Sequence, residues 1–208
     1  MTSIMTNNDI SELNTVTGIL SNGLVMVTET VSGVPLEVSQ ALTQAREQMR
    51  ELPGVIENLN AAFVSYNTVS AALTRMMELA DQASGDTVSE EDQAMMNGEF
   101  VNLAKIVAAD AGRQYYSGPR LNLTSQGEAQ SAARILAYMK PVMANTGQEL
   151  AEQRGLIYEV ISETINFLGL VANCYPEAEG TSSLQTLVSE ACRDSSFTLN
   201  TESSAHLH

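Results

Sequence analysis

Apolar side chains recur at the spacing of an amphipathic helix between Leu59 and Ala83. They occupy two positions of a seven-residue repeat, three residues apart: Leu59, Tyr66, Leu73 and Ala80 in the first, and Ala62, Val69, Met76 and Ala83 in the second. This is the pattern of a helix that packs one face against a neighbouring helix. The opposite face is polar, which predicts that it stays in water.

A turn and a second helix follow in the same stretch. Gly85 suits the end of a helix because glycine adopts a positive φ without a steric penalty. Ser89 followed by Asp92 resembles a capping box, and the three carboxylates of residues 90–92 suit the positive end of a helix dipole. These signals predict a helix, a tight turn and a second helix that continues to Val107.

The rest of the chain repeats the helical spacing. It predicts further helices over residues 10–31, 36–52, 128–170 and 183–192. Pro53, which lacks a backbone donor and clashes with the preceding turn, predicts a kink or break. A cluster of Gly, Ser and Pro over 112–127 predicts a loop, anchored by Tyr115 and Tyr116. The predicted fold is all-α: an elongated, coiled-coil-like antiparallel helical rod with short terminal helices.

The chain is strongly acidic. The formal net charge is −15, with only 10 Lys and Arg. No basic surface is therefore available to neutralise phosphates, which excludes nucleic acid as a partner and argues equally against an anionic membrane surface. No apolar run approaches the roughly 18 residues of a membrane span, so we expect no membrane insertion. The start of the chain also lacks the basic and apolar regions of a signal peptide.

Few residues are suited to catalysis or metal binding. Both histidines, His206 and His208, lie in a polar tail, and neither a Ser/His/Asp or Cys/His arrangement nor a glycine-rich phosphate loop can be assembled. We therefore predict a protein that is not an enzyme and uses no cofactor. The methionines of the helical stretches are expected in the core, although methionine is also suited to a partner groove: Met76, Met77, Met95, Met96, Met139 and Met143.

The two cysteines, Cys174 and Cys192, lie 18 residues apart. No histidine stands at ligand spacing beside them, so no metal site is expected. Two interpretations stay open: one disulfide, if the protein is exported, or two free, buried thiols.

Several motifs resemble the rod domain of bacterial flagellin. Residues 72–83 (ALTRMMELADQA), followed by a turn, Asp92 and Glu99-Phe100, are similar to the family's ALxRxRELAxQ segment, N-G-T turn, Asp and Glu–apolar pair. Residues 110–121 stand where flagellins carry a T-x-F-N-G-x-x-L turn, and residues 42–45 (LTQA) match the preceding helix. Two further segments, 152–154 and 163–168, resemble the S-Q-R … N-T-I-N-N-L signature of the C-terminal rod helix.

The resemblance covers residues 36 to 170 and suggests three segments. These are an N-terminal helix over 1–34 that has diverged from the family's inner-core helix, a rod domain over 35–170, and a diverged C-terminal segment over 171–208 with a short helix and polar tail. The short loop after Val107 leaves no room for the outer variable domains of long flagellins. The family's segment before the LTQA motif is mostly missing, with only Ser32-Gly33 kept.

The resemblance implies a structural subunit of a flagellar filament or flagellin-like assembly, formed by lateral packing of helical rods. It implies copies of itself or other flagellins as partners, an export chaperone, and a host Toll-like receptor. It further implies export by the flagellar type III apparatus, without a cleaved signal, to the extracellular flagellum. Two alternatives are a hook–filament junction protein of the same superfamily and a secreted binding or type III translocator-like filament protein.

The family also suggests a contact surface for subunits or a receptor. Arg75, Leu79, Gln82 and Glu99 match the family's contact positions, whereas Met77 replaces the second Arg of the motif, which would weaken a polar contact. The alternative is that Arg75 is only a solvated helix residue.

Overall fold

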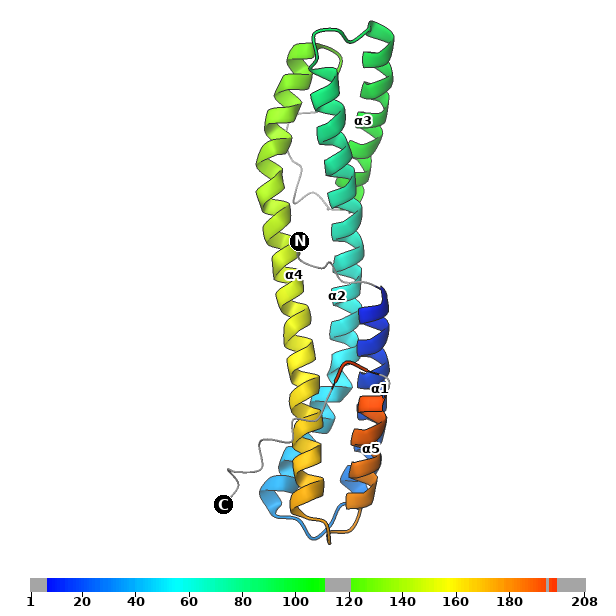
Figure 1. Cartoon of the computed structure of the whole chain (residues 1–208), viewed down its shortest axis with the longest axis vertical. Coiled ribbons are helices and arrows are strands. Elements are labelled where there is room, and N and C mark those ends of the chain that lie inside the picture. The colour runs from blue at the N-terminus through cyan, green and yellow to red at the C-terminus, as the bar shows by residue number, and fades with distance from the viewer. Residues whose placement is uncertain (1–6, 111–120, 194, 198–208) are drawn as a thin grey trace. The chain divides into compact units, whose positions relative to one another are not determined.

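The computed structural model describes residues 7–110, 121–193 and 195–197, and this part of the chain is all-α. It holds five helices, shown in Figure 1: α1 (Asn7–Thr30), α2 (Leu36–Ala83), α3 (Glu90–Asp110), α4 (Gln126–Cys174) and α5 (Thr181–Arg193). The described residues contain no strand, only an isolated bridge between Ser32 and Glu179. The predicted all-α class is confirmed.

Of the two outcomes predicted at Pro53, a kink or a break, the break is wrong, because α2 continues through this residue. A proline removes one intrahelical hydrogen bond and does not by itself stop a helix that tertiary contacts hold. Here Met49 and Ile56 are fully buried on either side of Pro53, and Leu52 is buried next to it. The predicted loop over 112–127 ends where α4 begins, but Tyr115 and Tyr116 lie outside the described residues.

The chain divides into two compact units. The described part of one, which we call the α3 unit, comprises residues 61–110 and 121–150, with α3 and parts of α2 and α4. The other, the α1–α5 unit, comprises the described residues up to 60 and from 151 onward. The first and last helices, α1 and α5, belong to one unit, and the three segments suggested by the sequence stay a prediction.

The α3 unit is built on one hydrophobic core to which α2, α3 and α4 all contribute. Three hydrogen bonds connect the segments around the starts of α3 and α4. The Gln126 amide donates to the Ser84 carbonyl (3.1 Å) and to Asp86 (2.6 Å), and the Leu123 backbone N–H donates to Asn97 (2.7 Å). The start of α4 is thereby held beside the turn between α2 and α3. The fully buried large side chains of this core are Leu79, Phe100, Leu123 and Leu136.

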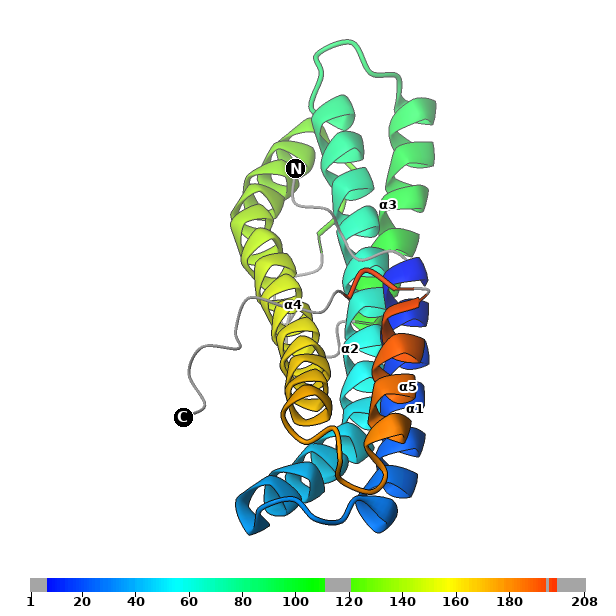
Figure 2. The same cartoon turned by 60° about the horizontal axis from the view of Figure 1, so that its bottom comes forward.

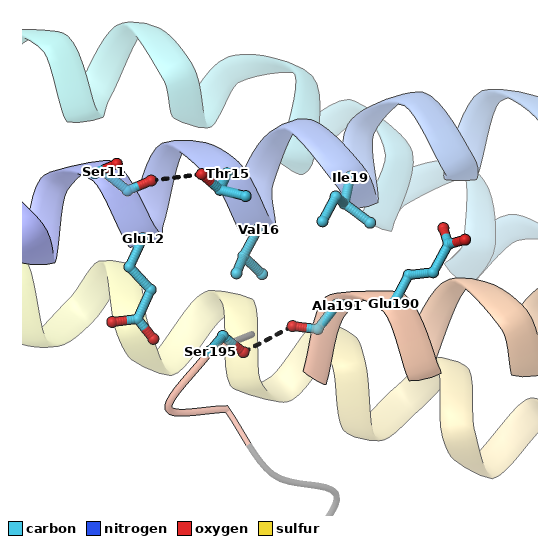
Figure 3. Close-up of a pocket in the computed structure, with 8 residues that line it drawn as sticks. All are labelled: Ser11, Glu12, Thr15, Val16, Ile19, Glu190, Ala191 and Ser195. Carbon is cyan, nitrogen blue, oxygen red and sulfur yellow. Dashed lines mark hydrogen bonds between the residues drawn. The ribbon is translucent and has the colours of Figure 1, made fainter. Parts of the chain in front are cut away.

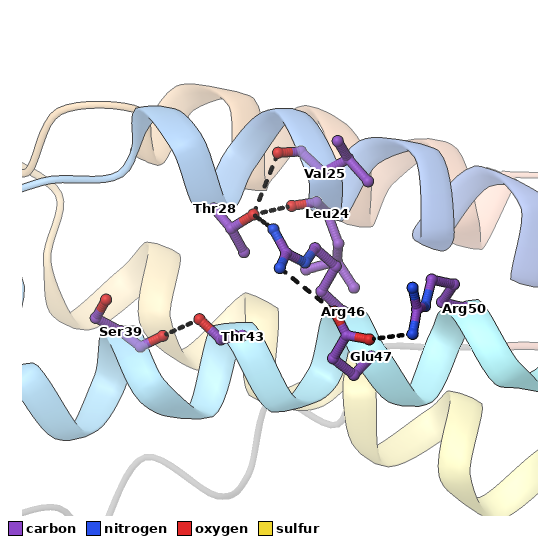
Figure 4. Close-up of polar contacts among 8 residues, drawn as sticks. All are labelled: Leu24, Val25, Thr28, Ser39, Thr43, Arg46, Glu47 and Arg50. Carbon is purple, nitrogen blue, oxygen red and sulfur yellow. Dashed lines mark hydrogen bonds and ion pairs between the residues drawn. The ribbon is translucent and has the colours of Figure 1, made fainter.

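The α1–α5 unit brings the first and last helices together, side by side in Figures 1 and 2. Arg46 on α2 donates to the Thr28 hydroxyl on α1 (3.2 Å), and that hydroxyl donates to the Leu24 carbonyl (2.8 Å), as Figure 4 shows. On α4, the Tyr158 ring stacks on Phe197, with 5.3 Å between ring centroids. Helices far apart in sequence thus close one unit.

Gly23 allows the close approach of α5 to α1. A Cβ at Gly23 would lie 2.2 Å from a methyl of Leu187, whereas one at Gly18 would have no atom within 4 Å. We therefore expect Gly18→Ala to stabilise the protein by up to about 1 kcal/mol through helix propensity. Gly23→Ala gains the same propensity but overpacks the contact, at a cost of about 1–3 kcal/mol, and is expected to destabilise.

Urea unfolding followed by circular dichroism measures both variants. Opposite signs of the change in unfolding free energy are expected. A Gly23→Ala protein stabilised as much as Gly18→Ala would mean that Leu187 moves aside without cost.

The expectation that no segment is as apolar as a membrane span needs correction. Among the described residues, α4 contains an 18-residue stretch that could cross a membrane by length and composition, although no such segment was expected. A helix in the core of a bundle passes the same test, because packing also requires apolar side chains. Of this stretch, 44% is buried within the protein.

Candidate functional site

The site that the sequence suggested lies in the α3 unit, where α2 ends and α3 begins. The capping signal is confirmed: the Asp92 backbone N–H donates to the Ser89 hydroxyl (3.1 Å), and that hydroxyl donates to the Asp92 carboxylate (2.6 Å). Ser89 therefore satisfies one of the unpaired donors at the start of α3. The cap thus fixes the residue at which α3 begins.

An open groove of about 480 Å³ lies in this region. The four predicted contact residues, from α2 and α3, all line it, although up to 24 residues separate them in sequence. Its wall alternates apolar and charged side chains. The lining residues are Arg75, Leu79, Gln82, Thr87, Val88, Asp92, Met95, Met96 and Glu99.

Arg75 and Glu99 join the two helices through a two-pronged ion pair. Arg75 Nε lies 2.7 Å from Glu99 Oε1 and Nη2 lies 3.2 Å from Oε2, while Nη1 reaches Glu78 Oε2 at 3.0 Å. The hydrogen bonds to Glu99 and then Glu78 raise the pKa of Arg75, and the hydrogen bond from Arg75 lowers the pKa of Glu99. The guanidinium is thus oriented by two carboxylates along one edge of the groove.

Two side chains of the groove are not where the sequence pattern placed them. Leu79 is only 1% exposed and belongs to the core, so it forms part of the buried floor of the groove. Met95 was expected in the core, but 68% of it is exposed, which corrects that prediction. The apolar pattern along the sequence did not show which of these side chains is buried and which is exposed. A groove between two helices leaves part of the apolar face of each helix uncovered. Met77 is half-buried against the core.

Both cysteines are free, and a disulfide between them does not agree with the fold. The Thr181 hydroxyl donates to the Tyr175 carbonyl (2.8 Å), so α5 starts beside the end of α4, where Cys174 lies. Cys192 comes eleven residues later on α5, about 16 Å along the helix, while a disulfide needs Cα atoms within about 7 Å. Cys174 is exposed; burial raises the pKa of the half-buried Cys192 thiol.

A second groove, between α1 and α5, has no chemistry that suggests a reaction (Figure 3). The Thr15 hydroxyl donates to the Ser11 carbonyl (2.8 Å) and the Ser195 hydroxyl to the Ala191 carbonyl (2.7 Å), so backbone carbonyls accept both hydroxyl protons. Glu12 accepts a hydrogen bond from the Ser196 backbone N–H. Within the described residues, no group of three His, Cys, Asp or Glu side chains could hold a metal ion.

Comparisons with family models, curated proteins and solved structures found no match for this chain.

The ion pair makes a testable prediction about pH. Arg75→Ala is expected to raise the pKa of Glu99 from its lowered value back to the ordinary range of a glutamate, because the dominant hydrogen bond is lost. In the native protein this pair stabilises the fold above the carboxyl pKa of the unfolded chain, and the contribution disappears as pH falls through the lowered pKa of Glu99. Carboxyl ¹³C NMR titration measures the shift.

Arg50→Ala is the matched control, because Arg50 is an exposed α2 arginine paired only with Glu47. It should leave the pKa of Glu99 unchanged. An unchanged Glu99 titration in Arg75→Ala would contradict the two-pronged ion pair.

Proposed function

We propose that this protein is a non-catalytic, flagellin-like structural subunit that assembles by lateral packing of its helices. The observation that carries the proposal is the groove, which gathers Arg75, Leu79, Gln82 and Glu99 from two helices. These are the positions that resemble the contact surface of flagellin. The all-α architecture is compatible with such a subunit.

The chemistry of the groove suits recognition of another protein. Arg75 is held by two carboxylates, so it loses little side-chain entropy when a partner binds. Met95 is exposed at the rim and adapts readily to a partner surface. Arginine beside adaptable apolar side chains is typical of interface centres.

The described helices also expose large apolar side chains that the monomer does not use. On α3 and α4 they include Ile106 (44% exposed), Tyr138 (80%) and Val142 (48%). Single exposed apolar residues are common, but several on neighbouring turns of one helix favour a protein–protein surface. This supports assembly over a purely solvated bundle.

The further parts of the proposal follow from the family resemblance. The partners would be copies of the same chain or other flagellins, with an export chaperone before assembly and a host Toll-like receptor afterwards. The place of action would be the extracellular flagellum. A hook–filament junction protein would use the same surfaces with a different neighbour.

Electron microscopy of the purified protein tests the proposal, after addition of salt or of preformed filament seeds. Helical filaments, or addition to the seeds, are expected. Arg75→Ala should weaken assembly, whereas Arg50→Ala should assemble as the native protein does. A chain that stays monomeric under all these conditions would contradict assembly and favour the secreted binding protein.

A further inference from the structure

The outward face of α4 in the α3 unit carries an apolar patch centred on Tyr138. Ile135 and Val142, 38% and 48% exposed, lie one turn before and after it, so the three share one side of the helix. Arg134 and Glu149, both exposed, stand on the same side. This side therefore runs from a positive charge, across an apolar centre, to a negative charge.

The outward face of α3 carries the opposite order of charges. Exposed Glu91 stands near its start, exposed Lys105 near its end, and Met95 between them, on one side of the helix. Glu91 and Lys105 are 14 residues apart, about 21 Å along the helix; Arg134 and Glu149 are 15 residues apart, about 22 Å. Two helices laid in parallel would therefore pair both charges, whereas antiparallel helices would place like charges together.

The cations of these two faces, Arg134 and Lys105, form no ion pair within the described part of the monomer. In the described part of the chain, Arg46, Arg50, Arg75, Arg154 and Arg193 all have a carboxylate within 4.0 Å. Arg134 and Lys140 have no such partner among the described residues, and Lys105 contacts the side chain of Asn102, at 3.5 Å. In a chain with a net charge of −15, a cation without a carboxylate is available to a second molecule.

Gly98 is a further feature of the α3 face that the monomer does not explain. It is exposed, its φ is not positive, and a Cβ there would have no atom within 4 Å. A glycine inside a helix costs about 1 kcal/mol relative to alanine. It does, however, leave the backbone open to close approach by another helix.

We propose that the α4 face of one copy docks in parallel on the α3 face of a second copy. Aligning Arg134 with Glu91 places Tyr138 beside Met95 and Glu149 beside Lys105, and brings the turn that holds Val142 over Gly98. The two faces belong to different helices, so the contact is heterologous and each copy keeps one face free for the next. This inference rests on the proposed function, because it specifies how the subunits associate.

Charge reversal tests the pairing. Arg134→Glu and Glu91→Arg are each expected to raise the concentration needed for assembly by about tenfold or more, because like charges then meet. Both changes in one chain should restore assembly. Lys140→Glu is the matched control: it makes the same charge change at an exposed α4 residue that lies away from this face. Sedimentation and electron microscopy measure assembly, and circular dichroism verifies that each variant is folded.

The outcomes separate this contact from the proposed function. If the native protein assembles and Arg134→Glu assembles equally well, this contact is wrong and the proposed function stands. If the folded double variant assembles as poorly as the single variants, the Arg134–Glu91 pairing is wrong. If the native protein never assembles, both proposals fail.

Cross-linking tests the heterologous geometry directly. In a background of Cys174→Ser and Cys192→Ser, a Tyr138→Cys protein mixed with a Met95→Cys protein should form a disulfide-linked dimer under mild oxidation. Each protein alone should form little. Equal cross-linking in the separate samples, or none in the mixture, would overturn the proposed contact.

Discussion

Replacing Phe100 by alanine is expected to lower the free energy of unfolding by about 3–5 kcal/mol. Phe100 is fully buried on α3 and belongs to the core of the α3 unit. Its removal loses apolar contacts and leaves a cavity that the surrounding helices fill only in part. Urea unfolding monitored by circular dichroism measures the change, as a lower midpoint with little change in slope.

Ile106→Ala is the matched control for this prediction. Ile106 lies on the same helix but is 44% exposed, so its truncation should cost far less. A comparable loss in the two variants would mean that α3 does not pack through Phe100.

The second large effect is expected at Gly180, in the turn before α5. Its φ is +83°, and a Cβ there would lie 3.0 Å from the backbone of Thr30 and Val31. The neighbouring bridge joins Ser32 N–H to the Glu179 carbonyl (3.2 Å). Gly180→Ala is expected to cost about 1–2 kcal/mol for the left-handed backbone and about 1–3 kcal/mol for crowding.

Gly33→Ala separates the cost of the left-handed backbone from the cost of crowding. Gly33 has nearly the same φ, +82°, but a Cβ there would meet no atom within 4 Å. It should therefore show only the backbone cost. Thermal unfolding of both variants gives the difference, and equal losses would show that the chain around Thr30 yields to the added methyl group.

If the proposed function holds, the arrangement of the groove would give its contacts specificity. Arg75 is oriented by Glu78 and Glu99, and Met95 is exposed. The charge would then fix the register of a partner, and the apolar side chain would contribute contact area. The α4 face proposed for docking follows the same logic with Arg134 and Tyr138.

The start of α3 could be predicted because its signals are local, whereas the four contact residues were suggested only by the family resemblance. The Ser89 cap depends on residues within one helical turn, and the structure confirms it. The pairing of Arg75 with Glu99 could not be derived from helical spacing, because it depends on how two helices are placed side by side. The exposure of Met95 and the burial of Leu79 could not be predicted for the same reason, because the burial of an apolar side chain depends on the position of the neighbouring helix.

Helix periodicity, caps and turn glycines were sufficient to predict an all-α protein and most of its helices, because each of these signals acts within a few residues. The continuity of α2 through Pro53, the grouping of α1 with α5, and the separation of Cys174 from Cys192 required the tertiary structure. Each depends on contacts between residues far apart in the chain, and their free energy is not encoded in any local pattern. Helix α2 therefore continues through Pro53, because buried side chains on both sides of the proline hold the helix in place.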